Sequence, residues 1–135
     1  MLDDFAGDWV ISREITDFRI METGRLEGTA SFVRDGDGLF YAERGILEFA
    51  SGAPMTAERS YHWSFAETEV TVAYADGSPF HSFEMTGGPE ATPHLCGDDM
   101  YRGTYSFVRF PNWQVTWTVK GRRKNYRSVT HYARA

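Results

Sequence analysis

Two alternating runs of residues flank an Asp-Gly turn early in the chain. Arg25–Arg34 reads RLEGTASFVR, the turn is Asp35-Gly36-Asp37-Gly38, and Leu39–Phe49 reads LFYAERGILEF. In the first run, apolar or small side chains alternate with polar ones: Leu26, Gly28, Ala30 and Phe32 against Glu27, Thr29 and Ser31. Asp-Gly between two runs of period two is a strong hairpin signal. This stretch therefore predicts an antiparallel hairpin with one apolar and one polar face.

The same alternation and turn signals recur along the whole chain. They predict about ten strands at spacings of roughly 8–12 residues, as in all-β barrels and sandwiches. The connections are short, which favours a meander in which each strand pairs with its neighbour in the chain. The expected strands are Trp9–Thr16, Arg25–Arg34, Leu39–Phe49, Thr56–Phe65, Glu69–Tyr74, Pro79–Met85, Ala91–Cys96, Met100–Arg109, Trp113–Lys120 and Tyr126–Arg134. Before them, Leu2–Gly7 is expected to form a lead-in of one helical turn.

Closing this sheet gives the fold that we predict: a single all-β domain over residues 1–135, an antiparallel meander barrel of about 8–10 strands. A closed sheet has no unpaired edge, and ten strands enclose a cavity. Small residues expected on the inner face, such as Gly28, Ala30 and Gly103, favour a cavity over a solid core.

Composition excludes several classes of partner. The chain has 135 residues, of which 41% are hydrophobic and 16% aromatic, enough for one well-filled core. Its net charge of −5 argues against nucleic acid and anionic membranes as partners. A lone cysteine suits a reducing compartment, and no stretch resembles a signal peptide or a membrane span. We expect a soluble, cytoplasmic, bacterial protein that is a monomer or homodimer.

The motif Phe5-x-Gly7-x-Trp9 stands at the start of the first expected strand. Gly-x-Trp in this place resembles the signature of the calycins, which include the lipocalins and the fatty-acid-binding proteins. In that group the tryptophan closes the base of the barrel, and an arginine near the end of the chain packs over it. The resemblance implies this part for Arg134.

A second resemblance covers nearly the whole chain. It is to a bacterial family of small lipocalin-like domains with no assigned function, so it implies a fold and no activity. The motifs that carry it are Gly7-x-Trp9, Tyr41-x-Glu43-x-Gly45, Arg59-x-Tyr61-x-Trp63, Asp76-Gly77, Phe80-His81-x-Phe83, His94-x-Cys96-Gly97-x-Asp99-x-Tyr101 and Lys124-x-Tyr126.

Polar residues are concentrated in the stretch from His81 to Tyr105, which holds the only cysteine and two of the four histidines. A hairpin about Gly88 and Pro89 would place His81 opposite Cys96 and Phe83 opposite His94. A second hairpin, capped by Asp98-Asp99, would place Cys96 opposite Tyr101 and His94 opposite Gly103. These registers predict a polar row of His81, Cys96 and Tyr101, with space beside His94 because Gly103 has no side chain.

A ligand pocket is the function that these residues favour. The expected inward aromatics Tyr61, Trp63, Tyr105 and Trp117 lie beside Arg59, and Arg59-Ser60-Tyr61 resembles the Arg-x-Tyr pair with which fatty-acid-binding proteins hold a carboxylate. We therefore expect a small, partly apolar, anionic ligand, with Arg59 alternatively paired to Glu43 or placed at the rim. The predicted binding residues are Arg59, Tyr61, Trp63, His81, His94, Cys96, Tyr101, Tyr105 and Trp117.

An enzyme is the alternative function: a hydrolase, isomerase or cyclase with His81 or His94 as general base and Tyr101 or Asp99 as its partner. His81 beside Cys96 would also suit a thiol nucleophile.

Metal and haem are two further ligands for which the sequence offers candidate residues. The histidines, Cys96 and Asp98 or Asp99 offer zinc-type ligands, but one thiol and no repeated ligand pair favour a hydrogen-bonded network instead. His131, if inward, would offer haem an axial ligand. We expect no metal and no cofactor.

Overall fold

The computed structural model describes residues 2–86 and 90–135. One short helix, α1 (Leu2–Phe5), precedes ten strands. These are β1 (Gly7–Asp17), β2 (Glu22–Asp35), β3 (Gly38–Phe49), β4 (Met55–Ala66), β5 (Glu69–Tyr74), β6 (Pro79–Glu84), β7 (His94–Cys96), β8 (Asp99–Arg109), β9 (Asn112–Lys120) and β10 (Asn125–Arg134). The prediction of an all-β fold is confirmed, and each expected strand overlaps an observed one. Within the described residues, no helix is long and apolar enough to cross a membrane.

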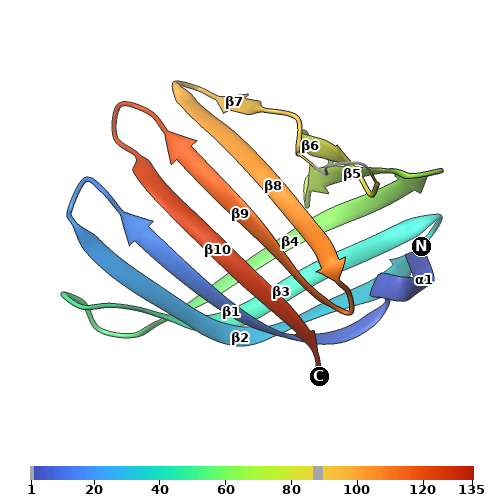
Figure 1. Ribbon diagram of the computed structural model, residues 1–135, viewed down its shortest axis with the longest axis horizontal. Coiled ribbons are helices and arrows are strands. Elements are labelled where there is room, and N and C mark those ends of the chain that lie inside the picture. Colours follow the sequence, from blue (N-terminus) through green and yellow to red (C-terminus); the bar gives the residue numbers. More distant parts are fainter. Residues whose placement is uncertain (1, 87–89) are drawn as a thin grey trace.

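All ten strands form one antiparallel sheet, in the order β6-β5-β4-β3-β2-β1-β10-β9-β8-β7 (Figure 1). The order follows the chain except where β1 pairs with β10, from Trp9 opposite Arg134 to Asp17 opposite Tyr126. Residues 91 and 92 link the two ends of the sheet: Ala91 N–H donates to Gly103 O at 2.9 Å, and Thr92 N–H to Ser82 O at 2.8 Å. The sheet is therefore a nearly closed barrel.

The base of the barrel is closed by Trp9, which is fully buried. Its indole N–H donates to the carbonyl of Phe5, the last residue of α1, at 2.9 Å. The Arg134 guanidinium lies 4.0 Å from the centre of the Trp9 ring and donates to the carbonyls of Asp4 and Ala6. The expectation that Arg134 packs over Trp9 is confirmed, and both ends of the chain meet here.

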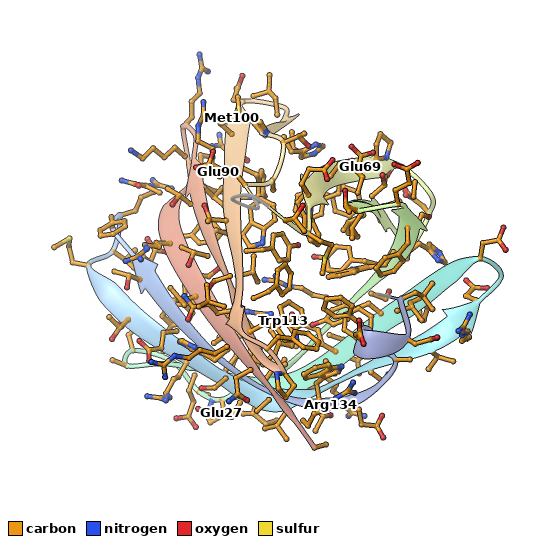
Figure 2. The ribbon with its side chains drawn as sticks, turned by 45° about the vertical axis from the view of Figure 1, so that its right-hand side comes forward. Glu27, Glu69, Glu90, Met100, Trp113 and Arg134 are labelled. Carbon is orange, nitrogen blue, oxygen red and sulfur yellow. The ribbon has the colours of Figure 1, made fainter. Side chains whose placement is uncertain are left out.

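Inner and outer faces follow the sequence alternation. Leu26, Ala30 and Phe32 are buried, whereas Glu27 and Thr29 are exposed. Figure 2 shows the same contrast between Trp113 inside the barrel and Glu27 outside it. Successive side chains of a strand point to opposite faces of the sheet, so every second residue is buried inside the barrel.

Two glycines that we expected to widen the cavity have a different role. A Cβ on Gly28 would lie 2.2 Å from the carbonyl oxygen of Arg44, so this glycine lets β2 and β3 approach closely. A Cβ on Gly103 would lie 2.7 Å from the ring of Trp117. The expected space beside His94 is therefore filled by an indole of the protein itself.

Candidate functional site

A cavity of about 190 Å³ lies inside the barrel. Side chains from β1, β3–β6 and β8–β10 line it, and most of them are aromatic. Tyr105 and Trp113 on its wall are buried, while Arg59, Tyr101 and Tyr126 remain partly or largely exposed. The cavity therefore runs from a buried interior to a rim at the end of the barrel opposite Trp9. It is smaller than the pockets that enclose drug-sized molecules.

A buried ion pair lies in the wall of this cavity. Arg13 donates from Nη1 to Glu43 Oε2 at 2.7 Å and from Nη2 to Glu43 Oε1 at 2.8 Å, and the two side chains are only 4% and 3% exposed. Arg13 Nε donates to Thr130 Oγ1 at 2.6 Å. The Tyr41 hydroxyl donates to Glu43 Oε1 at 2.6 Å and lies 2.7 Å from the Tyr132 hydroxyl. Both charges are thus paired and hydrogen-bonded, as burial requires.

The pKa values of this pair reflect opposing effects. Burial disfavours both charges, but the hydrogen bonds and the opposite charge of the partner outweigh it. As a result the pKa of Arg13 is raised and the pKa of Glu43 is held below its usual value. The charge of Arg59 also lowers the pKa of Glu43.

The alternative in which Arg59 pairs with Glu43 is wrong. Arg59 does lie opposite Glu43 in the register of β3 and β4. Both carboxylate oxygens, however, already accept bonds from Arg13, and Arg59 is exposed at the rim. Arg13 was missed, although it alternates with Trp9 and Ile11 on the inner face of β1, a pattern that could have revealed it.

His81 is the buried histidine of the site, with 6% of its surface exposed. Its Nε2 lies 2.7 Å from the Tyr105 hydroxyl, and its ring packs against Phe80 and Trp117. Burial, with a smaller effect from the charge of His94, lowers the pKa of His81 to about 3. Burial also raises the pKa of Tyr105 well above its usual value. Both groups are therefore neutral near pH 7.

The predicted row of His81, Cys96 and Tyr101 does not form. In the observed register of β7 and β8, His94 lies opposite Tyr101, and Cys96 lies opposite Asp99. The turn is centred on Gly97-Asp98, where Gly97 takes a left-handed φ of 63°, one residue earlier than we expected. Moving the centre of the turn by one residue shifts the pairing by two residues, so Cys96 does not lie opposite Tyr101; it is exposed.

The other proposed hairpin is also wrong. His81 pairs with Val72 of β5, and Ser82 bonds to Thr92, so Cys96 does not lie opposite His81. The turn that we placed at Gly88 and Pro89 lies outside the described residues.

Most of the predicted binding residues do share one cavity. Its wall contains Arg59, Tyr61, Trp63, His81, Tyr101, Tyr105 and Trp117. His94 is half-buried beside the rings of Phe80 and Tyr101, outside the wall. The role of these residues in binding stays a prediction.

The candidate partners Tyr101 and Asp99 both lie beside Lys124. Asp99 lies 3.6 Å from Lys124, whose Nζ donates to the Tyr101 hydroxyl at 3.2 Å, so both proposed partners face a lysine. The Nε2 of His81 bonds to Tyr105 and its Nδ1 has no partner, so the proposed pair of His81 with the Cys96 thiol does not form. His131 is exposed rather than inward, which contradicts its suggested role toward haem. Within residues 2–86 and 90–135, no three His, Cys, Asp or Glu side chains group as metal ligands would.

The low pKa of His81 predicts that the protein loses stability as the pH falls from 7.5 to 5.0. The pKa is about 3 in the folded protein, against an ordinary value of 6.5. Between these two pH values, His81 becomes protonated in the unfolded chain but stays neutral in the folded protein. The free energy of unfolding should therefore decrease by about 2 kcal/mol. Urea unfolding at the two pH values measures it.

His81→Gln is the control, because it should remove most of this pH dependence. The other three histidines are unchanged in this variant, so the difference between the two proteins isolates His81. The low pKa of Glu43 acts below its usual value of 4.5, outside the chosen window. Equal losses in wild type and variant would contradict the prediction.

Ten antiparallel strands in a nearly closed barrel, a Trp–Arg base and an aromatic cavity define a lipocalin-like β-barrel. The chain belongs to a family of unknown function (DUF6314), whose sequence pattern matches residues 5–134. No curated protein matches the chain.

Two solved structures share the fold. The S-type phycobiliprotein lyase CPES from Guillardia theta is similar with a TM-score of 0.67 and 8% identity, over 99% of this chain and 90% of the lyase. A protein of unknown function from the DUF3598 family of Nostoc punctiforme has a TM-score of 0.60 and 10% identity, over 98% of this chain and 47% of that protein. At such low identity these likenesses describe the fold alone.

Proposed function

We propose that this protein binds a small, partly apolar, anionic molecule inside its barrel. The observation that carries the proposal is the cavity of about 190 Å³, whose wall is mostly aromatic and includes the exposed Arg59. An apolar wall with a few polar atoms is typical of small-molecule sites.

The charge at the rim favours an anionic ligand. Arg59 lines the cavity, is exposed, and lowers the pKa of Glu43 through its charge. Glu43 is already neutralised by Arg13 in the interior. An anionic group of a ligand in the cavity would meet the guanidinium of Arg59 at this exposed end.

Binding explains the site better than catalysis does. With a pKa of about 3, His81 is a weak base at neutral pH, whereas a general base works best with a pKa near the working pH. Asp99, the carboxylate considered as the partner of a histidine base, lies 3.6 Å from the ammonium group of Lys124. The remaining expectations from the sequence, a bacterial source, a cytoplasmic location and a monomer or homodimer, stay predictions.

Native mass spectrometry tests the proposal. Protein purified without denaturation should carry an additional mass that is lost on denaturation, or should bind 1-naphthoate added as a probe and monitored by tryptophan fluorescence. Protein that carries no added mass and does not bind 1-naphthoate would contradict the proposal.

Arg59→Gln should weaken the binding of 1-naphthoate by roughly three- to tenfold, because the charged contact is at an exposed rim. Raising the salt concentration should weaken binding to wild type more than to the variant. Arg25→Gln is the matched control, since Arg25 is an exposed arginine of β2 paired with Glu27 on the outer face. An equal effect of both substitutions would show that Arg59 acts only through net charge.

A further inference from the structure

Positive charge is concentrated in one part of the chain. Residues 100–135 contain eight of the 14 basic residues and none of the 19 acidic ones. They form most of β8 and all of β9 and β10, which are neighbours in the sheet. The net charge of −5 therefore combines a basic side of the barrel with an acidic remainder, and it does not describe how the basic side meets an anionic partner.

The outer face of these three strands carries cations without acidic partners. Arg102 lies opposite Thr118, and Thr118 lies opposite Arg127, so one row of side chains crosses β8, β9 and β10. The residue that follows each of them is buried on the inner face, so the row faces outward.

With its neighbours at the β9–β10 turn, this row forms what we call the basic surface: Arg102, Lys120, Arg122, Arg123 and Arg127. All five side chains are exposed. Within residues 2–86 and 90–135, only Arg122 has an acid within ion-pair distance, Asp98 at 3.9 Å. The other four cations are therefore available to a partner.

An apolar turn lies beside the basic surface. In the β1–β2 turn, Phe18, Ile20 and Met21 are 45%, 55% and 82% exposed. The N–H of Phe18 donates to the carbonyl of Asn125 at the start of β10, at 2.8 Å. The guanidinium of Arg19 donates to the carbonyl of Arg123. Figure 1 shows both turns on the left, at the end of the barrel away from α1.

Met21 has a backbone conformation that its side chain does not favour. Its φ of 55° lies in the left-handed region, where glycine and asparagine are the usual residues. With 82% of its surface exposed, packing inside the protein does not compensate for this conformation. A strained residue that the fold does not require points to a role outside the fold.

We propose that this end of the protein binds the surface of an anionic phospholipid bilayer. The basic surface would contact the lipid headgroups, and Phe18, Ile20 and Met21 would enter the boundary between headgroups and acyl chains. Basic side chains beside exposed apolar ones are the combination that holds proteins on anionic membranes. The rim of the cavity lies at the same end, because its residue Tyr126 stands between Asn125 and Arg127.

The apolar turn favours a bilayer over nucleic acid, the other common partner of a basic surface. Phosphates of nucleic acid would also pair with the arginines. The aliphatic side chains of Ile20 and Met21, however, offer bases neither a hydrogen bond nor a stacking surface. Two separate sets of residues are thus expected to contribute to binding, one by charge and one by burial in lipid.

Vesicle flotation tests the proposal with the full chain and without any ligand for the cavity. The protein should bind vesicles of phosphatidylcholine and phosphatidylserine mixed about two to one, and should bind pure phosphatidylcholine vesicles roughly tenfold less. Added salt should release it, because screening weakens the contact between the basic surface and the lipids. Absence of binding to the anionic vesicles would overturn the proposal and leave the proposed function of the cavity untouched.

Arg123→Gln/Arg127→Gln should lower the partition coefficient on the anionic vesicles roughly tenfold, because it removes two charges of the basic surface. Arg25→Gln/Arg44→Gln is the matched control. It removes the same charge from β2 and β3, where the two arginine side chains are 62% and 72% exposed. An equal loss in both variants would show that binding follows net charge alone, and would overturn the docking surface.

Ile20→Ser/Met21→Asn should lower the partition coefficient several-fold without loss of stability, since asparagine tolerates the left-handed φ of position 21. Val33→Ser/Val108→Ser is its control: these valines are 59% and 92% exposed and lie near the base of the barrel. Binding that is unchanged by the first variant, or reduced equally by both, would overturn the proposal. So would binding to duplex DNA, but to no vesicle, that depends on Arg123 and Arg127 alone.

Discussion

Replacing Glu43 with glutamine should lower the free energy of unfolding by about 3–5 kcal/mol, the usual cost of leaving a buried charge without its partner. Arg13 would keep its positive charge inside the barrel, since its pKa is already far above neutrality. Two bonds of its guanidinium to the carboxylate, at 2.7 and 2.8 Å, would lose their ionic character. Urea unfolding at pH 7.5 measures the loss.

The matched control is Glu27→Gln, which breaks an exposed pair with Arg25 whose atoms lie 3.0 Å apart. Solvent screens an exposed pair, which contributes little to stability, so this variant should unfold close to wild type. The double variant Arg13→Met/Glu43→Leu should recover much of the stability, because it removes both buried charges together. Similar losses in Glu43→Gln and Glu27→Gln would show that the barrel interior does not isolate the pair from solvent.

Trp9→Ala should destabilise the protein by about 3–5 kcal/mol, the range for removing a large aromatic side chain from a core. Trp9 is fully buried and packs against Phe110, Trp113 and the guanidinium of Arg134. Its loss would open the base of the barrel and leave Arg134 without a ring to cover. Thermal and urea unfolding both report this change.

Val10→Ala is the control for the base of the barrel. Val10 is the next residue of β1, but its side chain faces outward and is 46% exposed. Its truncation should change stability by no more than about 0.5 kcal/mol. If Val10→Ala were as costly as Trp9→Ala, the strand itself rather than the closed base would be the sensitive element.

The fold could be predicted because its signals are local. Alternation within Arg25–Arg34 identifies the inner face, and Asp-Gly places the turn, without knowledge of any distant residue. The partner of Glu43 is not a local property. Arg59 is its direct neighbour across β3 and β4, yet Arg13 reaches it from β1, which is separated from β3 by β2. The contact between Arg13 and Glu43 crosses β2, so the pairing of neighbouring strands does not predict it.

The sequence predicted which residues line the cavity, but it did not predict how the strands around Cys96 pair. Inward alternation correctly grouped Tyr61, Trp63, Tyr105 and Trp117 around one cavity. The register near Cys96 depended on a single turn residue, Gly97, so a one-residue error in the turn removed the cysteine from the site. The bond from His81 to Tyr105 spans β6 and β8 near the two ends of the sheet, and the pairing of neighbouring strands does not predict it.

The pairing of β1 with β10 has a consequence for how the chain reaches its fold. It joins residues near opposite ends of the sequence, such as Trp9 and Arg134, so the entropy of closing nearly the whole chain must be lost before these contacts form. Such a high contact order predicts refolding on the order of milliseconds to seconds instead of microseconds. Until β10 has emerged from the ribosome, β1 is an open strand edge that can pair with other chains, and a growing polypeptide would need protection there.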